Sequence, residues 1–455
     1  MGITKRLGDM PLSRWHWRLL LIISVGWAFD AMDTGIVSFV LPRLMKIWDL
    51  SGAQIGFIGS IGLIGMAVGA VVAGSMADSV GRKKLLAATM LIYGLGTGGC
   101  GLSWSYESLL FFRFVVGFGL GGQVPVAVTL LSEYSPTKYR GRMIVLLESS
   151  WAVGWLLAAL ISYLIIPEYG WQLAFFIGAF PAVWVIYVWK AVPESAMYLV
   201  KKGRLEEAHA IVCEIEKSIG IPYGEMPKAE EAQPSSSTKS FGLAQLFGRK
   251  YIKKTICLWI LWFGLVFSYY GIFMWLPTLL VKAGHSMVQS FSFIMWMTLA
   301  QLPGYFTAAA LVDRIGRKPT LASFLILCAV TAYFFGNASS WNEIIFWGCM
   351  MSFFNLGAWG LMYTYTPEMY PTEARASGTG WAGACGRIGG MLAPMVVGVL
   401  FTGPDKFSLV FAVFTGVLVI IGLNVLILGE ETMNKSLDDE KEMDGLQAEM
   451  AEPKA

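Results

Sequence analysis

Five ionisable residues interrupt long apolar stretches of this 455-residue sequence, and these residues are the best placed for chemistry. An ionisable group with apolar surroundings is costly unless it faces a polar cavity or a partner. The five are Asp30, Asp33, Arg113, Glu148 and Arg387. At 1.5 Å per helical residue, Asp33 lies about 12 Å before the C-terminal end of its stretch and Arg113 about 9 Å after the N-terminal end of its stretch, and both distances are counted from the same, outer side. Similar depths permit an ion pair, which is either functional or a fixed structural salt bridge.

Arg387 lies about 15 Å into its apolar stretch, near the middle. A guanidinium group binds a carboxylate through two parallel, charge-assisted hydrogen bonds. Arg387 is therefore a candidate for binding an anionic ligand. The alternative is a structural ion pair with Glu148 or Asp30.

Aromatic and amide side chains on the same and neighbouring stretches are candidates for binding a flat ring. Offset stacking adds about 0.5–1.5 kcal/mol per ring pair beyond the burial of area. The aromatic candidates are Trp151, Trp155, Tyr269, Tyr270, Trp359 and Tyr363, and the amide candidates are Gln123, Gln301 and Asn355. For each aromatic residue taken alone, packing in the core or at a lipid interface is the alternative.

Residues for enzymatic chemistry are scarce. The six cysteines are scattered without paired spacing, and the three histidines are dispersed, so neither a disulfide framework nor a metal site is predicted. We find no nucleophile with its base and no phosphate-binding loop. The sequence predicts that the protein is not an enzyme, uses no cofactor and binds no nucleic acid, since its net charge is only +3.

Composition indicates what must position these residues. Hydrophobic residues make up 56% of the chain and charged residues only 14%, whereas a soluble protein carries about 25% charge. About 20 apolar residues cross a bilayer as a helix. Twelve such stretches occur, at 18–41, 53–77, 85–104, 107–131, 143–166, 172–192, 255–279, 289–312, 319–338, 341–365, 377–401 and 406–429. The fold class is therefore an all-α membrane protein.

The distribution of lysine and arginine predicts the orientation. One set of loops carries almost all of these residues, and the opposite set has only Arg43, Lys46, Lys282 and Lys406. By the positive-inside rule, both termini and the long middle loop face the cytoplasm. The first apolar run is too long for a cleaved signal peptide. We expect a multi-pass protein of the cytoplasmic membrane, with the lipid bilayer as a partner and a monomeric state.

A charged pattern occurs twice at a spacing of 235 residues. Asp78, Gly81, Arg82 and Lys83 recur as Asp313, Gly316, Arg317 and Lys318, and Glu133 and Arg140 recur as Glu368 and Arg375. Two patterns with one spacing indicate duplicated halves. Each half holds six spans, an even number, so the halves are parallel six-helix bundles. The predicted domains are 1–192, a linker with a short amphipathic helix at 193–254, 255–429, and a tail at 430–455.

The repeated pattern resembles the G-x-x-x-D-x-x-G-R-K signature of the major facilitator superfamily, although Ala309 replaces the first glycine of the second copy. The stretches "VPESAMYLVKKGRLEEA", "PEMYPTEARASG" and "EETMNKSLDD" resemble its sugar-porter branch. The resemblance implies a tight glycine turn and ion pairs that latch the two halves on the cytoplasmic side; structural anchoring is the alternative. The predicted latch residues are Asp78, Arg82, Glu133, Arg140, Asp313, Arg317, Glu368 and Arg375.

The cargo is indicated by further stretches. In place of the glutamines typical of sugar porters, the seventh span reads "LWFGLVFSYYGIFMWLP". This segment and stretches such as "GWAFDAMDTGIVSFVLP" and "SFFNLGAWGLMYTYTPEMYPT" resemble the bacterial niacin permeases of the superfamily and, more distantly, the synaptic-vesicle glycoproteins. The resemblance implies a secondary active transporter that imports nicotinate by alternating access. The alternatives are a transporter of another aromatic acid or of a sugar, and a receptor that retains the pocket without transport.

The resemblance also implies roles for the ionisable residues. In proton-coupled relatives, an aspartate at the place of Asp33 faces an arginine at the place of Arg113, and protonation releases the pair. Asp30 and Glu148 are further candidates for proton coupling, and for Asp30 a polar helix contact is the alternative. An arginine followed by I-G-G at the place of Arg387 is similar to organic-anion members of the superfamily. A carboxylate on Arg387 and a ring among the aromatic candidates would suit nicotinate, with an amide at the pyridine nitrogen.

Overall fold

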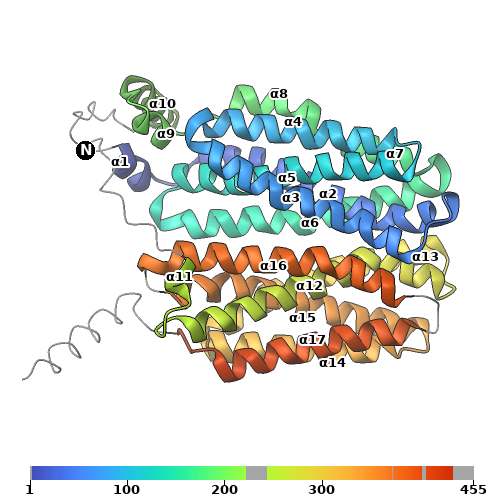
Figure 1. Ribbon diagram of the computed structural model, residues 1–455. Coiled ribbons are helices and arrows are strands. Elements are labelled where there is room, and N and C mark those ends of the chain that lie inside the picture. Colours follow the sequence, from blue (N-terminus) through green and yellow to red (C-terminus); the bar gives the residue numbers. More distant parts are fainter. Residues whose placement is uncertain (1–2, 222–242, 371, 402–405, 434–455) are drawn as a thin grey trace, which may run out of the picture. The chain divides into compact units, whose positions relative to one another are not determined.

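A computed structural model describes residues 3–221, 243–370, 372–401 and 406–433, and every regular element in these ranges is a helix (Figure 1). Residues 222–242 of the predicted linker and most of the predicted tail lie outside the described residues. By its contacts the chain divides into two compact units, 1–236 with 286–292, and 237–285 with 293–455. The domain boundaries expected from the sequence stay a prediction.

The first unit is built from long helices that pack side by side. Its elements are α1 (Ile3–Asp9), α2 (Arg14–Ile47), α3 (Gly52–Val80), α4 (Arg82–Gly101), α5 (Tyr106–Tyr134), η1 (Thr137–Tyr139), α6 (Arg140–Tyr169), α7 (Trp171–Gly178), α8 (Pro181–Ala191), α9 (Ala196–Lys201) and α10 (Leu205–Ile219). Helix α3 packs along α5, and α2 packs along α6. The single span predicted at 172–192 is two helices, because the chain turns before Pro181, which has no backbone N–H to donate to the preceding turn.

Glycines allow the helices of this unit to approach closely. A Cβ atom at Gly119 of α5 would lie 2.6 Å from the backbone nitrogen of Tyr93 on α4. One at Gly94 of α4 would lie 2.5 Å from the backbone nitrogen of Ala182 on α8. Such contacts are typical of membrane helices, whose association depends on close packing rather than on the hydrophobic effect.

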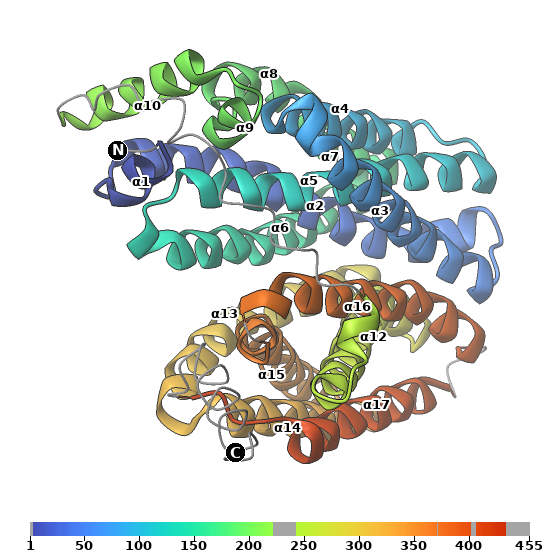
Figure 2. The same cartoon turned by 60° about the vertical axis from the view of Figure 1, so that its left-hand side comes forward.

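The described part of the second unit has six long helices and one short one, and Figure 2 labels the long ones. They are α11 (Leu243–Leu246), α12 (Ile252–Lys282), α13 (Met287–Ile315), α14 (Arg317–Gly336), α15 (Trp341–Glu368), α16 (Thr372–Leu400) and α17 (Phe407–Leu428). Helix α12 packs along α16, and α14 packs between α15 and α17. This arrangement places α12, α15 and α16, which carry most of the predicted binding residues of this unit, next to one another.

The predicted spans agree with these helices. Each of the twelve overlaps a helix of the structure, and ten segments are long and apolar enough, by length and composition, to cross a membrane. The two predicted spans outside these ten coincide with α4 and α13. Helix α4 begins with Arg82, Lys83 and Lys84 and is rich in glycine, which lowers its mean hydropathy.

A buried ion pair fastens α10, the amphipathic helix expected in the linker, to the N-terminal helix α1. The Arg6 guanidinium donates to both carboxylate oxygens of Glu216, at 3.0 and 2.7 Å. Only 6% of Arg6 and 4% of Glu216 are exposed. Removal of one partner from such a pair is costly, because the other charge stays buried without compensation. Helix α10 is therefore an integral part of the first unit.

Candidate functional site

Asp33 and Arg113 form a buried ion pair inside the first unit. Arg113 Nη1 donates to Asp33 Oδ2 at 2.6 Å, and the side chains come from α5 and α2. The hydroxyl of Thr97 on α4 donates to the other carboxylate oxygen, Oδ1, at 2.8 Å. Asp33 is 0% exposed and Arg113 3% exposed. The structure thus brings the two predicted residues together, and their role in proton coupling stays a prediction.

Neighbouring small residues make room for the guanidinium. A Cβ atom at Gly62 of α3 would lie 3.0 Å from Arg113 Nη2, so a glycine there lets the side chain lie flat against α3. The thiol of Cys100, almost one turn after Thr97, is in hydrogen-bonding contact with Arg113. Helices α2 to α5 therefore all contribute to the position of this pair.

Asp30 lies near this pair in a different environment. It is 0% exposed, and its two carboxylate oxygens accept no hydrogen bond from any side chain or backbone group that the structure describes. It interacts electrostatically with Asp33 on its own helix and with half-buried Glu148 on α6. Gln123 of α5 is 1% exposed and lies against α2, 3.3 Å from where a Cβ of Gly26 would be. These buried polar groups surround the middle of α2.

The aromatic candidates of the second unit form one cluster. The ring centroids of Tyr269 and Trp359 are 5.0 Å apart, and those of Tyr269 and Tyr270 are 5.3 Å apart. Tyr363 continues the cluster, at 6.1 Å from Trp359 and 5.0 Å from Trp262. Trp262 was not among the predicted residues; it lies seven residues before Tyr269 on α12, a helical spacing that could have indicated it.

Arg387 projects from a helix that packs against this cluster. A Cβ atom at Gly390 of α16 would lie 3.2 Å from the ring of Tyr270, and one at Gly386 would lie 3.0 Å from the ring of Trp262. Arg387 is half-buried, and within the described ranges no residue forms a hydrogen bond or ion pair with its guanidinium. The second unit therefore combines a guanidinium group and aromatic rings on adjacent helices.

Two amide side chains lie buried in the same unit. Gln301 of α13 is 0% exposed, and neither its amide nitrogen nor its amide oxygen has a hydrogen-bond partner among the described residues. Asn355 of α15 is also 0% exposed; its amide nitrogen donates to Ser268 Oγ at 3.4 Å and to Cys328 Sγ at 3.7 Å. Gln301 thus retains both a donor and an acceptor for a polar ligand atom.

The other two aromatic candidates, Trp151 and Trp155, belong to the first unit. Trp155 of α6 is 1% exposed and packs against α2, 3.3 Å from where a Cβ of Gly35 would be, so packing is part of its role. Trp151, one turn earlier, is half-buried. The expectation that a ligand ring lies between these residues and the aromatic cluster of α12 and α15 stays a prediction.

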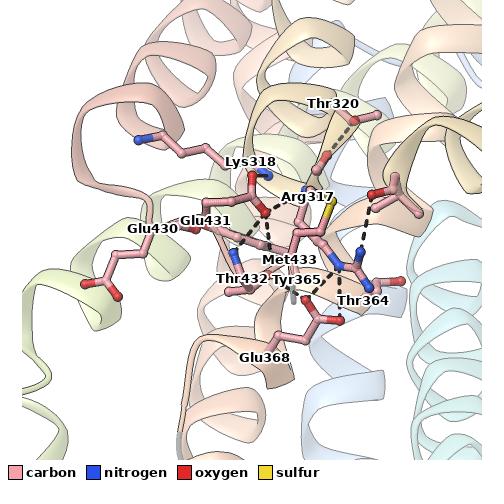
Figure 3. A network of polar contacts seen from close by, with 12 residues as sticks. Arg317, Lys318, Thr320, Thr364, Tyr365, Glu368, Glu430, Glu431, Thr432 and Met433 are labelled. Atoms are coloured by element: carbon pink, nitrogen blue, oxygen red, sulfur yellow. Dashed lines mark hydrogen bonds and ion pairs between the residues drawn. The ribbon is translucent and has the colours of Figure 1, made fainter. Parts of the chain in front are cut away.

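Among the described residues, the repeated charged pattern forms an ion pair in each unit. Arg82 pairs with Glu133, which also accepts a hydrogen bond from the hydroxyl of Ser195. In the second unit, the corresponding Arg317 Nε lies 3.1 Å from Glu368 Oε2, which accepts a hydrogen bond from Thr432 at 2.6 Å (Figure 3). Both ion pairs therefore connect helices of a single unit.

For the other predicted latch residues, the structure describes fewer side-chain contacts. Arg375 Nε donates to the backbone oxygen of Pro367 at 3.1 Å, and Arg140 is half-buried at the start of α6. The side chains of Asp78 and Asp313 lie outside the described part of the structure. A latch between the halves stays a prediction.

Two glutamates that sequence reasoning missed complete the network. Glu194 Oε1 accepts hydrogen bonds from the backbone nitrogens of Arg82 and Lys83, at 2.8 and 3.0 Å. Glu431 accepts from those of Arg317 and Lys318, at 2.9 and 3.2 Å (Figure 3). Each carboxylate thus caps a helix N-terminus, where negative charge is favourable. In the sequence, each of these glutamates shortly follows the last predicted span of a half, the sixth or the twelfth, and this shared position could have indicated them.

The glycines of the repeated pattern are required by these turns. Gly81 has φ 100° and Gly316 has φ 108°, in the region that favours glycine. Each glycine immediately precedes the helix that the glutamate caps. The resemblance had implied a tight glycine turn here, and the structure has one in both units.

Replacing Glu431 with glutamine should destabilise the second unit. Burial raises the pKa of Glu431, but hydrogen bonds from backbone N–H groups outweigh burial and hold the pKa below its usual range. Because the folded-state pKa is the lower one, the stabilisation is present above the unfolded-state pKa and disappears as pH falls through the folded-state pKa. We expect Glu431→Gln to lower the free energy of unfolding at pH 7 by about 1 kcal/mol, and by much less at about pH 3.5.

Thermal unfolding in detergent at the two pH values measures this effect. Glu430→Gln is the matched control, because the Glu430 side chain forms an ion pair with Lys254 at 3.4 Å and is 38% exposed, and such exposed pairs contribute little. Equal melting temperatures of Glu431→Gln and the unsubstituted protein at pH 7 would contradict the assigned capping role.

Comparison with known proteins agrees with this architecture. The family model described as sugar (and other) transporter matches residues 28–443. The chain belongs to this family. Its all-helical fold is that of the major facilitator transporters: the inward open xylose transporter XylE from E. coli has a TM-score of 0.73 at 17% identity, covering 94% of this chain and 99% of that one. The predicted fold class is thereby confirmed.

Relatives of the chain are transporters. The niacin transporter NiaP of Acinetobacter baylyi is 51% identical over 438 residues, covering 96% of this chain and 99% of that protein. A putative niacin/nicotinamide transporter of Bacillus subtilis is 43% identical over 421 residues, covering 92% and 98%. Proteins related to synaptic vesicle protein 2 also match. These findings confirm the predicted resemblances and that this family member is an integral membrane transporter, not an enzyme.

Proposed function

We propose that this transporter imports nicotinate across the bacterial cytoplasmic membrane by alternating access, with a proton as the coupling ion. The observation that carries the proposal is the half-buried guanidinium of Arg387, which is free of described partners and lies on a helix packed against Tyr270 and Trp262. Nicotinate has one carboxylate and one aromatic ring, which are the two groups that such a site would bind. The name of the Acinetobacter relative supports the same cargo.

Binding would combine charge, stacking and one polar contact. The carboxylate would accept two parallel hydrogen bonds from Arg387, and the ring would lie against Tyr270 and Trp359, which are half-buried in the cluster. An amide would donate to the pyridine nitrogen, and Gln301, with both amide atoms unpartnered in the described structure, is the strongest candidate. Gln123, Asn355, Trp151 and Trp155 remain candidates for the same site.

Proton coupling would operate at Asp33 and Arg113. In the ionised state the carboxylate accepts from Arg113 and Thr97, and a proton on Asp33 would weaken its attraction to Arg113. Asp30 and Glu148, which lie within electrostatic reach of each other, are candidates for a second proton site. Protonation and cargo binding together would permit the two halves to rock around the site.

Nicotinamide is the second candidate cargo, since the name of the Bacillus relative includes it. Nicotinamide keeps the ring but has no carboxylate, so it would gain little from Arg387. We further propose that both termini lie in the cytoplasm, as the positive-inside rule indicates, and that the protein acts as a monomer.

Counterflow of labelled nicotinate in liposomes tests the proposal. Purified protein is reconstituted with unlabelled nicotinate, nicotinamide, benzoate or glucose inside, and entry of label is measured. We expect strong counterflow with nicotinate, weaker counterflow with nicotinamide and benzoate, and none with glucose. Binding of nicotinate without any counterflow would instead indicate a receptor, and equal counterflow with benzoate would refute recognition of the pyridine nitrogen.

A further inference from the structure

Thr97 differs from other threonines of the bundle in what its hydroxyl contacts. A threonine inside a helix commonly donates to the backbone oxygen of the preceding turn. Thr89, on the same helix α4, does so: its hydroxyl donates to the backbone oxygen of Leu85 at 2.9 Å. The hydroxyl of Thr97 instead donates across to Asp33 Oδ1 on α2, at 2.8 Å. This hydroxyl therefore serves a contact between helices.

Packing directs the Thr97 hydroxyl toward Asp33. Thr97 is 0% exposed, and its methyl group, Cγ2, lies 3.0 Å from where a Cβ of Gly178 on α7 would be. With the methyl against α7, the branched side chain has few rotamers left, and the hydroxyl faces α2. The two oxygens of Asp33 are thus shared between two donors, Arg113 at Oδ2 and Thr97 at Oδ1.

We propose that Thr97 is a positioning residue that holds the Asp33 carboxylate ionised and directed at Arg113 until the coupling proton arrives. This inference rests on the proposed proton coupling. A hydroxyl that donates to a charged carboxylate forms a stronger bond than it forms with the neutral acid. Thr97 therefore favours the ionised state. It also keeps a contact after protonation, because a hydroxyl can accept as well as donate, whereas a guanidinium cannot accept.

Other titratable groups around Asp33 act in different ways. Arg113 on α5 supplies the opposite charge, and Asp30 on α2 interacts electrostatically with Asp33. Tyr93 and Cys100 on α4 also interact electrostatically with Asp33, and Glu148 on α6 acts on Asp30. Thr97 has no charge, so its loss changes the hydrogen bonding of Asp33 without changing the charge balance of the bundle.

Three substitutions separate this role from packing. Thr97→Val keeps the shape and loses the hydroxyl, Thr97→Ser keeps the hydroxyl, and Thr97→Ala is a second variant without it. In liposomes with an imposed pH gradient, nicotinate uptake is measured against external pH, and counterflow is measured without a gradient. We expect the Val and Ala variants to reach half-maximal uptake at a pH about one unit higher, with counterflow near the unsubstituted level at acidic pH. The Ser variant should match the unsubstituted protein.

The outcomes are distinguishable. A Val or Ala profile that coincides with the unsubstituted profile overturns the inference, and so does a Ser variant that is shifted as far as the Val variant. Loss of uptake and counterflow in the Ala variant, with the Val variant unchanged in both, would mean that Thr97 serves packing only. If the unsubstituted protein takes up nicotinate independently of the pH gradient, the proposed proton coupling itself is wrong. Uptake by the unsubstituted protein, measured with and without the gradient, tests this point separately from the variants.

Discussion

Replacing Arg387 with alanine is expected to weaken nicotinate binding about 100-fold while changing nicotinamide binding by less than about threefold. The guanidinium lies half-buried without a described partner, so its hydrogen bonds are available to a carboxylate. Charge-assisted hydrogen bonds contribute about 1.5–3 kcal/mol each, and partial exposure reduces that contribution. Nicotinamide has no carboxylate and loses little. Equilibrium binding of both ligands to purified protein measures the difference.

Two further variants sharpen this experiment. Arg387→Lys keeps the charge but loses the two parallel donors, so we expect a smaller loss of nicotinate affinity, about tenfold. Arg314→Ala is the control for net charge, because Arg314 is an exposed cation of the same unit. Equal losses for the two ligands, or no loss for either, would show that Arg387 does not bind the carboxylate.

Replacing Asp33 with asparagine should abolish accumulation of nicotinate driven by a pH gradient, lowering it by more than about tenfold. Asparagine is close in shape but cannot take up and release the proton. The exchange of nicotinate in counterflow should persist, because exchange does not require the proton to leave. Both rates are measured in the same liposome preparation, with the gradient imposed or collapsed.

Stability must be controlled in this variant. Asp33→Asn leaves the buried Arg113 without its anionic partner, which costs about 3–5 kcal/mol in comparable proteins. The double variant Asp33→Asn/Arg113→Gln removes that uncompensated charge and should recover stability without recovering accumulation. Retention of gradient-driven accumulation in either variant would identify the pair as a structural salt bridge.

Asp30→Asn tests the second acidic residue. Its carboxylate oxygens have no described hydrogen-bond partner, so the substitution breaks no ion pair. If Asp30→Asn abolishes gradient-driven accumulation while Asp33→Asn retains it, the coupling site is Asp30.

Ion pairs within each unit bear on how such a transporter moves. Arg82 with Glu133, and Arg317 with Glu368, tie helix ends together inside a single unit. Such contacts would keep each bundle intact in the proposed alternating access, in which the bundles would rock. They are therefore compatible with a latch between the halves but do not require one.

The amino-acid sequence was sufficient for the fold. Long apolar runs have few stable forms in a bilayer, because every backbone polar group must be paired internally, and helices satisfy this. A charged pattern repeated at one spacing then indicated the duplication. The break before Pro181 was not predicted, since apolar composition continues across it.

Part of the candidate site was also predictable from the apolar runs. Charged residues within apolar runs are rare enough to be noticed singly. Similar depth along two helices permitted an ion pair of Asp33 with Arg113, and the resemblance to proton-coupled relatives implied it. The depth of a residue along its helix does not give the rotation of that helix about its axis, so it does not say which neighbouring helix the side chain faces. The sequence could therefore not say that Trp155 packs against Gly35.

By itself, the sequence determined that this protein is a helical membrane protein with charged and aromatic residues inside its apolar runs, because hydropathy and charge are properties of the chain alone, and the resemblance to the superfamily implied transport. Only the tertiary structure decided which partners those groups have. Thr97, Glu194 and Glu431 are ordinary residues in the sequence, and they matter because folding brings them to Asp33 and to two helix N-termini. Contacts between distant residues depend on helix rotation and packing, and these follow from the folded arrangement of all the helices together.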